Sequence, residues 1–100
     1  MAEVILKTNK PDKVSEILKE TLETENSRVQ YSLDLTMARL REFEQKYNIS
    51  SEKFITQWGA EDLEGGDTEY VAWAGEYGFS LNLSERLAAL KSIKIDHVSS

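Results

Sequence analysis

The sequence predicts a mainly α-helical protein, built as a long antiparallel helical hairpin with a short connecting helix and short strands at its two ends. Two long segments have the composition and apolar spacing of helices, and neither glycine nor proline occurs from Asp12 to Asn48. The length of 100 residues indicates a single domain, 1–100. We expect helices at about residues 10–47, 51–58 and 68–92.

The first helix carries signals at both of its ends. Asn9 is a favourable N-cap, and Asp12, three residues later, completes the pattern of a capping box. Pro11 falls in the first turn, where its missing N–H group removes no hydrogen bond. Asn48 can adopt the left-handed conformation that ends many helices. These signals predict a helix from about residue 10 to residue 47.

The apolar residues of this helix form a heptad-like seam. They recur at intervals of three and four, and Asn26 and Thr36 occupy the two gaps. Val14 and Leu18 continue the stripe toward the start of the helix. Such a seam packs either inside a small bundle or against another chain, and both interpretations stay open. The seam consists of Leu22, Val29, Leu33, Leu40, Phe43 and Tyr47.

A short second helix follows directly. Ser50 is its expected N-cap, and Ile49 is placed to pack on Phe54 as a hydrophobic staple. We expect Gly59 to end the helix and residues 60–67 to form an acidic loop. Its apolar face consists of Phe54, Ile55 and Trp58.

The third helix is expected to begin at a cap provided by Gly66 or Asp67. Gly75 and Gly78 lie inside it, and each costs about 1 kcal/mol relative to alanine. We interpret them as positions where another backbone or ring packs closely, with a kink as the alternative. A small core at the helix junction is predicted from Ile49, Phe54, Trp58 and Trp73.

The two ends of the chain have a strand-like composition. Residues 3–8 and 93–98 mix β-branched and polar residues with partial alternation, so we expect them to pair with each other or across a dimer. The alternative is that the third helix continues to about Ile95 and that residues 1–8 are disordered. The expected inward positions are Val4, Leu6, Ile93 and Ile95.

The length of the first helix predicts a partner. A helix over residues 10–47 is about 55 Å long, whereas a compact globule of 100 residues is less than about 35 Å across. Two helices bury one stripe each, and apolar surface left exposed marks an interface. The simplest assembly is a two-fold homodimer built on the first and third helices, and the other is a stable complex with a different protein. Ten residues are candidates for these contacts: Leu22, Val29, Leu33, Leu40, Phe43, Tyr47, Trp58, Trp73, Tyr77 and Leu81.

Composition argues against several classes of function. The net charge of −6 gives no overall basic field for nucleic acid or anionic membranes. Because the chain has no cysteine, it has no disulfide and no thiolate zinc site. No apolar run approaches the roughly 20 residues that span a bilayer, and the start has too few apolar residues for a secretory signal. A cytoplasmic location is expected.

Catalytic and cofactor-binding motifs are missing from the sequence. His97 is the only histidine, and its place in the tail suggests a solvated side chain. The acidic stretch 61–69 does not have the spacing of an EF-hand loop. The sequence contains neither a glycine-rich phosphate loop nor a nucleophile elbow. We therefore expect no catalytic, cofactor-binding or metal-binding residue and no enzymatic activity.

The middle of the chain resembles a known family. The stretch 40–54, LREFEQKYNISSEKF, is followed by an acidic loop with glycines, by TEYVAWAGEY over 68–77, and by a leucine-rich helix. Over residues 12–90 this is similar to the TumA-like antitoxins of TumE-type toxin–antitoxin pairs. Gly75, Gly78 and the glycine-rich loop depart from that pattern. The matching positions are Phe43, Tyr47, Phe54, Trp73 and Tyr77.

The resemblance implies a prokaryotic cytoplasmic protein that binds a partner toxin and silences it, with no catalytic residue of its own. Toxins of such pairs usually act on RNA and need basic surfaces, which an acidic protein can reach quickly through electrostatic steering. Two alternatives remain: a structural helical homodimer and, more weakly, a nucleic-acid-binding regulator. The second is similar to ribbon-helix-helix repressors only in having a strand before helices, and that strand offers Lys7 as its one basic residue.

Overall fold

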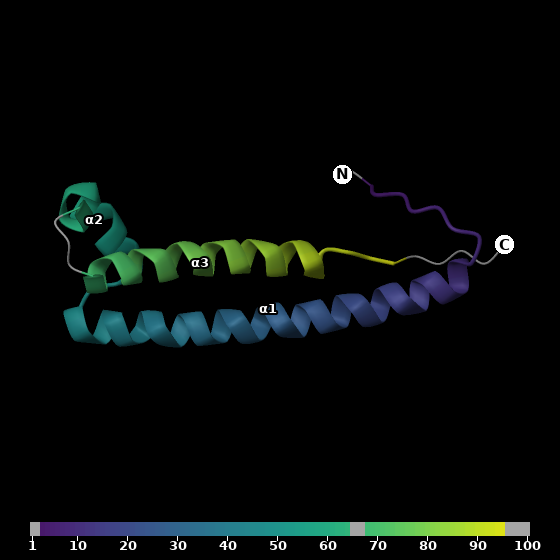
Figure 1. Ribbon diagram of the computed structural model, residues 1–100, viewed down its shortest axis with the longest axis horizontal. Helices are drawn as coiled ribbons and strands as arrows, with labels where there is room; N and C mark the ends of the chain where they lie inside the picture. Colours follow the sequence, from purple (N-terminus) through teal and green to yellow (C-terminus); the bar gives the residue numbers. More distant parts are fainter. Residues whose placement is uncertain (1–2, 65–67, 96–100) are drawn as a thin grey trace.

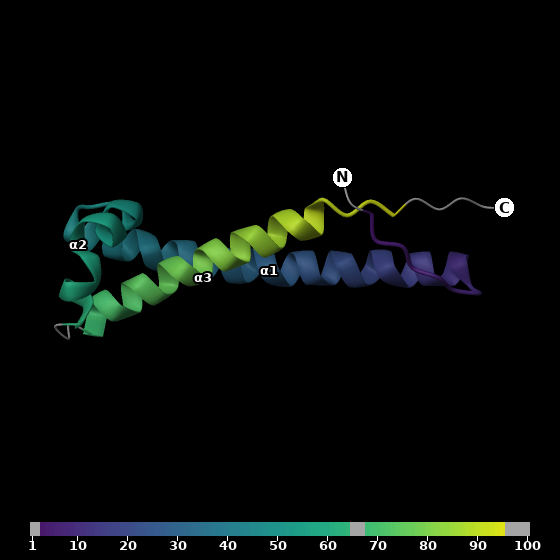
Figure 2. The same cartoon turned by 90° about the horizontal axis from the view of Figure 1, so that it is seen from above.

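The computed structural model describes residues 3–64 and 68–95, with side chains over 3–57 and 68–95. Its helices are α1 (Pro11–Tyr47), α2 (Ser51–Glu64) and α3 (Thr68–Lys91). α3 runs back along α1, and α2 packs at the end where the chain reverses, here called the closed end (Figure 1). Figure 2 shows that α3 crosses α1 at a shallow angle. The predicted helical hairpin with a short connecting helix is therefore present.

The molecule is elongated. Its principal dimensions are 62 × 24 × 18 Å, and its radius of gyration of 19.4 Å far exceeds the roughly 13 Å of a compact chain of this length. α1 has 37 residues and α3 has 24, so α1 continues well past α3 at the opposite end, here called the open end (Figure 1).

The first turn of α1 corrects the predicted capping box. Lys10, not Asn9, is the N-cap, and no side chain caps the helix there. The Lys10 carbonyl oxygen accepts the Val14 N–H at 3.0 Å. Because the fixed backbone angle of Pro11 suits the first helical position, the helix begins one residue later than the capping box requires.

The turn between α1 and α2 follows the sequence signals. Asn48 ends α1 in the left-handed region, with φ 54° and ψ 44°, as predicted. The Ser50 Oγ accepts the Lys53 N–H at 3.2 Å and caps α2, which confirms the predicted N-cap. The carboxylate of Glu44 in α1 accepts the Ser51 N–H at 2.7 Å. Both bonds satisfy N–H groups that the start of a helix leaves without a backbone partner.

The core between the helices has two clusters. One, toward the open end, is built on Val29, Leu83 and Leu87, with Leu33 and Leu90 packed against it. The other, at the closed end, is built on Leu40, Phe54 and Trp73, and Ile49 packs against it as the predicted staple requires. Thr36 and Ser80 are also buried, at sequence positions between the two clusters.

α2 does not end at Gly59 but continues to Glu64. A glycine inside a helix costs only about 1 kcal/mol, and Ala60–Glu64 are compatible with a helix, so residues 60–64 are helical rather than a loop. The predicted cap of α3 at Gly66 or Asp67 lies outside the described residues.

Gly75 and Gly78 do not mark close packing. A Cβ atom added at either position would meet no atom within 4 Å outside the local helix backbone. Both glycines are exposed on α3, which is α-helical from Thr68 to Lys91. The interpretation of these glycines as close-packing sites is therefore wrong.

The two ends of the chain contain no strand within residues 3–10 and 92–95. α3 ends at Lys91, so it does not reach Ile95 either. A two-stranded ribbon is marginal on its own, and here the two segments border a groove over the start of α1 instead of pairing as strands. The remaining part of the second predicted strand, 96–98, lies outside the described residues. None of the helices, over the residues that can be described, has the length and apolar character that crossing a membrane requires.

Candidate protein-binding surfaces

The closed end is sealed by stacked aromatic rings. Trp73 is fully buried, and its ring lies parallel to Phe54 with centroids 3.9 Å apart. Phe43 and Tyr47 of α1 each stack on it at 5.5 Å. The indole N–H donates to the Ser51 Oγ at 2.8 Å, which satisfies its only polar group. Because the chain itself surrounds Trp73, this ring holds the hairpin together and is not displayed to a partner.

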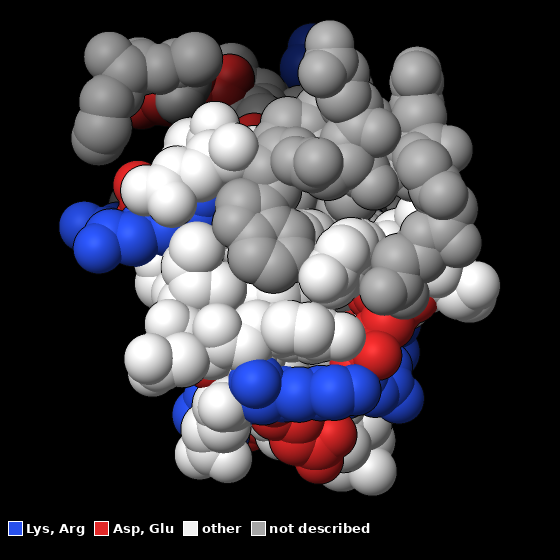
Figure 3. All heavy atoms as spheres, turned by 90° about the vertical axis from the view of Figure 1, so that its left-hand side faces the viewer, with Lys and Arg blue, Asp and Glu red and all other residues white. Residues whose placement is uncertain are grey.

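Two ion pairs connect α1 to α3 toward the closed end. Arg39 contacts Glu76 at 3.1 Å, and Lys46 contacts Glu69 at 2.7 Å. Hydrogen bonds from the Lys46 side chain, then from Tyr47, lower the pKa of Glu69. In Figure 3, which looks onto this end, basic side chains lie directly against acidic ones. The described residues on this end of the molecule therefore carry charges of both signs, and neither sign dominates the surface seen in Figure 3.

A third charged cluster lies near the end of α3. The Glu25 carboxylate accepts hydrogen bonds from Arg28 at 2.7 Å and from Arg86 at 2.9 Å. Hydrogen bonds from Arg28, then Arg86, lower the pKa of Glu25 to about 2. Glu25 therefore stays ionised in the folded protein far below neutral pH and links α1 to α3 through Arg86.

The side of α3 that faces away from α1 is free of charge over much of its length. Between Tyr70 and Ser84 the only charged residue is Glu76, and it pairs with Arg39. Three apolar side chains project here, with 52%, 49% and 54% of their surface exposed: Val71, Phe79 and Leu81. We call Val71, Gly75, Gly78, Phe79, Leu81 and Asn82 the outer face of α3.

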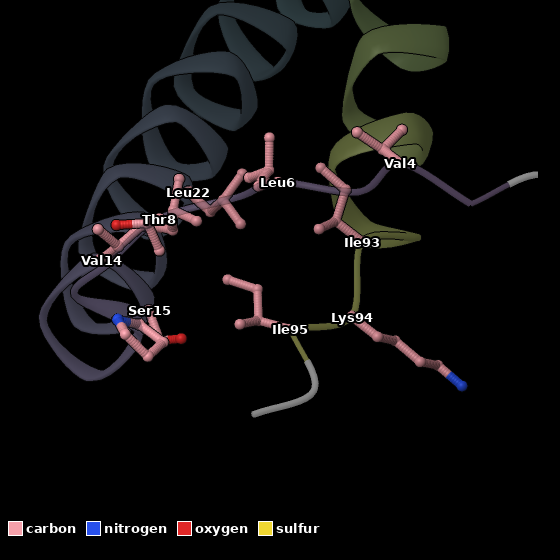
Figure 4. Close-up of a pocket in the computed structure, with 11 residues that line it drawn as sticks. Val4, Leu6, Thr8, Val14, Ser15, Leu22, Ile93, Lys94 and Ile95 are labelled. Carbon is pink, nitrogen blue, oxygen red and sulfur yellow. The ribbon is translucent and has the colours of Figure 1, made fainter. Parts of the chain in front are cut away.

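The open end contains an apolar groove with a volume of about 540 Å³. Its floor is the start of α1, and the end segments 3–8 and 93–95 form its sides (Figure 4). Among the described residues that line it, Lys94 alone is charged, and its side chain points away from the groove in Figure 4. The lining residues are Val4, Leu6, Thr8, Pro11, Val14, Ser15, Leu18, Leu22, Ile93, Lys94 and Ile95.

The ten predicted contact residues fall into different environments. Val29, Leu40 and Trp73 are buried in the hairpin, and Leu33, Phe43, Tyr47 and Tyr77 pack around them. The heptad-like seam therefore contacts α3 of the same chain. Leu22 lines the open-end groove, and Leu81 lies on the outer face of α3. Trp58 is in α2, but its side chain is outside the described part.

Several exposed apolar residues were not among these candidates. Val71 and Phe79 lie on α3, and Tyr31, Leu35 and Met37 lie on α1. They are off the heptad-like seam, so a search for the best helical stripe passes over them. The signal that identifies the outer face of α3 is different: it is the scarcity of charge between Tyr70 and Ser84.

No metal site is indicated among the side chains that the structure describes. Within residues 3–57 and 68–95, no group of three or more acidic or histidine side chains is placed to hold a metal ion. The acidic side chains of 61–67 and His97 lie outside the part described at side-chain level. Comparison with protein-family models, curated proteins and solved structures found no match to this chain.

Proposed function

We propose that the protein works by binding another protein, as an antitoxin-type inhibitor that neutralises a small partner toxin. The outer face of α3 is the observation that supports this proposal most. A helix that is apolar on both sides is normally covered on both sides, yet in this chain α1 covers only one of them.

The exposed area supports a binding role of this kind. The chain exposes 7,903 Å², whereas a compact monomer of 11.4 kDa exposes about 5,800 Å². The excess of about 2,100 Å² exceeds the roughly 800 Å² that each partner buries in a standard interface. An elongated chain with an excess of exposed area on this scale has room for such an interface.

Charge indicates the chemistry of the partner. The chain carries −6 overall, while the outer face of α3 is uncharged. A partner with an apolar patch inside a basic surface would be attracted by the acidic chain and would bury Phe79 and Leu81 on contact. A small toxin that acts on RNA needs a basic surface, and a partner of this kind is what the resemblance to TumA-like antitoxins implies.

Co-expression with the product of the adjacent gene tests the proposal. We expect the two proteins to co-purify and the growth arrest caused by the partner to be relieved. Phe79→Glu should abolish both effects, because it replaces one of the three exposed apolar side chains of the outer face with a charge. Tyr31→Glu is the matched control, since Tyr31 is an exposed ring on α1, and it should leave both effects unchanged.

Two results would contradict the proposal. If the adjacent gene product neither co-purifies nor arrests growth, the antitoxin role is wrong and the structural homodimer becomes the better interpretation. If Phe79→Glu binds as tightly as the wild type, the partner uses another surface. A DNA mobility-shift assay on the pure protein tests the nucleic-acid-binding alternative.

A further inference from the structure

The groove at the open end leads to an inference that is independent of the proposed toxin partner. Arg86, five residues before the end of α3, is level with Glu25 of α1. Since the helices are antiparallel, α3 ends beside about residue 20 of α1. The residues before that point extend beyond α3 by about 15 Å. We call Pro11–Leu22, which lies beyond and just beside the end of α3, the α1 overhang.

The apolar stripe of the overhang continues the one that α3 covers. Val14, Leu18 and Leu22 are four residues apart, and Val29 of the buried core follows seven residues later on the same face. All three overhang residues line the groove and are only half-buried. Among the residues that the structure describes, no helix covers this part of the stripe.

The groove is suited to a copy of itself. A chain with a net charge of −6 repels its copies, but the described lining of the groove contains no carboxylate. The only charge, on Lys94, is directed away from the groove (Figure 4). Two such surfaces can therefore meet without like-charge repulsion at their centre.

The spacing of the stripe is symmetric about Leu18. In an antiparallel pair of overhangs, Leu18 meets Leu18 of the second copy, and Val14 meets Leu22 of the second copy in both directions. A two-fold interface needs a surface of this self-complementary kind. The contact would be centred on Leu18, which lies beyond the end of α3, so that the second overhang covers part of the stripe that α3 leaves open.

We propose that the protein is a two-fold homodimer in which the α1 overhangs of two copies pack antiparallel in each other's open-end grooves. A standard interface of about 800 Å² per copy uses less than half of the excess exposed surface. The outer face of α3 remains available for a different partner.

The absence of cysteine allows a direct test by cross-linking. Leu18→Cys places two thiols against each other on the symmetry axis, and mild oxidation should convert most of the protein to a covalent dimer. Glu20→Cys is the matched control, because its side chain is exposed on the opposite side of the overhang. It should cross-link no more than random collision allows.

A charge exchange gives a second, independent measurement. Leu18→Glu should raise the dimer dissociation constant more than about 100-fold, because it buries two unpaired carboxylates. Leu18→Lys should do the same, and an equal mixture of the two variants should restore a dimer in light scattering. Circular dichroism should show that both variants keep the helical content of the wild type.

Three outcomes would overturn this dimer. The first is a wild-type protein that is strictly monomeric at high micromolar concentration. The second is equal cross-linking of Leu18→Cys and Glu20→Cys. The third is a dimer that withstands Leu18→Glu but is lost in Phe79→Glu, since that would place the contact on α3. Binding of the toxin partner is measured separately, so it can succeed or fail independently of these results.

Discussion

The two ends of this hairpin are both rich in apolar side chains, yet they are covered very differently. At the closed end α2 returns over the hairpin, and Trp73 has no exposed surface. At the open end no helix returns over α1 within the described residues, and Val4 is 90% exposed. The difference shows that apolar content alone does not separate a core from an interface. What separates them is whether the same chain supplies a covering element.

The largest expected effect is at the closed end. Trp73→Ala should lower the free energy of unfolding by about 3–5 kcal/mol, because it removes a fully buried ring that stacks on three others. Urea unfolding followed by circular dichroism measures this change. Trp73→Phe keeps one aromatic ring but loses part of the buried volume and the bond to Ser51, so its loss should be smaller than that of Trp73→Ala. An unchanged midpoint for Trp73→Ala would remove the contrast between the ends.

The glycines of α3 should give a change of opposite sign. Gly75→Ala and Gly78→Ala should each raise the free energy of unfolding by about 1 kcal/mol, because alanine is the better helix former and its Cβ meets no atom. Thermal unfolding of the two single variants and the double variant checks both the sign and the additivity. A loss of stability would mean that α3 must bend where it is now a regular helix.

Glu25, near the end of α3, should make the free energy of unfolding depend on pH. Its pKa is about 2 in the folded protein, below the value near 4.3 of an unfolded carboxyl group. A depressed pKa stabilises the fold above about pH 4.3, and this contribution disappears as the pH falls toward 2. Glu25→Gln should therefore lower the melting temperature at pH 7, and the difference should shrink as the pH falls from about 4.3 through 2. High salt should reduce the effect at pH 7, and a difference that is constant with pH would contradict it.

The smallest effect is expected at the open end. Leu6→Ala should change the free energy of unfolding by less than about 0.5 kcal/mol, measured at a concentration below that of dimer formation. The reason is that Leu6 is mostly exposed in the single chain. A loss comparable to that of Trp73→Ala would show that the end segment is part of the core of one chain.

The sequence was most informative where local chemistry decides the structure. Asn48 and Ser50 mark the turn because a left-handed C-cap and a hydroxyl N-cap depend on single residues. Ile49, Phe54 and Trp73 share a core as predicted, since the staple and the apolar spacing place them together. The heptad-like seam predicted that α1 packs against another helix, although it did not show whether that helix belongs to the same chain or to a partner.

Other features depended on competition between elements and were not predictable from local patterns. Gly59 does not stop α2, because the cost of one glycine is smaller than the gain from the turns that follow. Pro11 shifts the start of α1 away from Asn9. The hydrogen bond from Trp73 to Ser51 joins residues 22 positions apart, and no local sequence pattern predicts that these two residues form a pair.

The buried Thr36 and Ser80 have a consequence for how the molecule comes apart. They lie at positions between the core cluster of Val29 and the core cluster of Trp73, and small hydroxyl side chains contribute little apolar contact there. A core divided in this way can open locally in stages. We expect the helix segments around the Val29 cluster to exchange their amide hydrogens through partial opening, while the segments around the Trp73 cluster stay closed. The two long helices would then separate first at the open end, and separation would halt near Thr36 before the closed end opens.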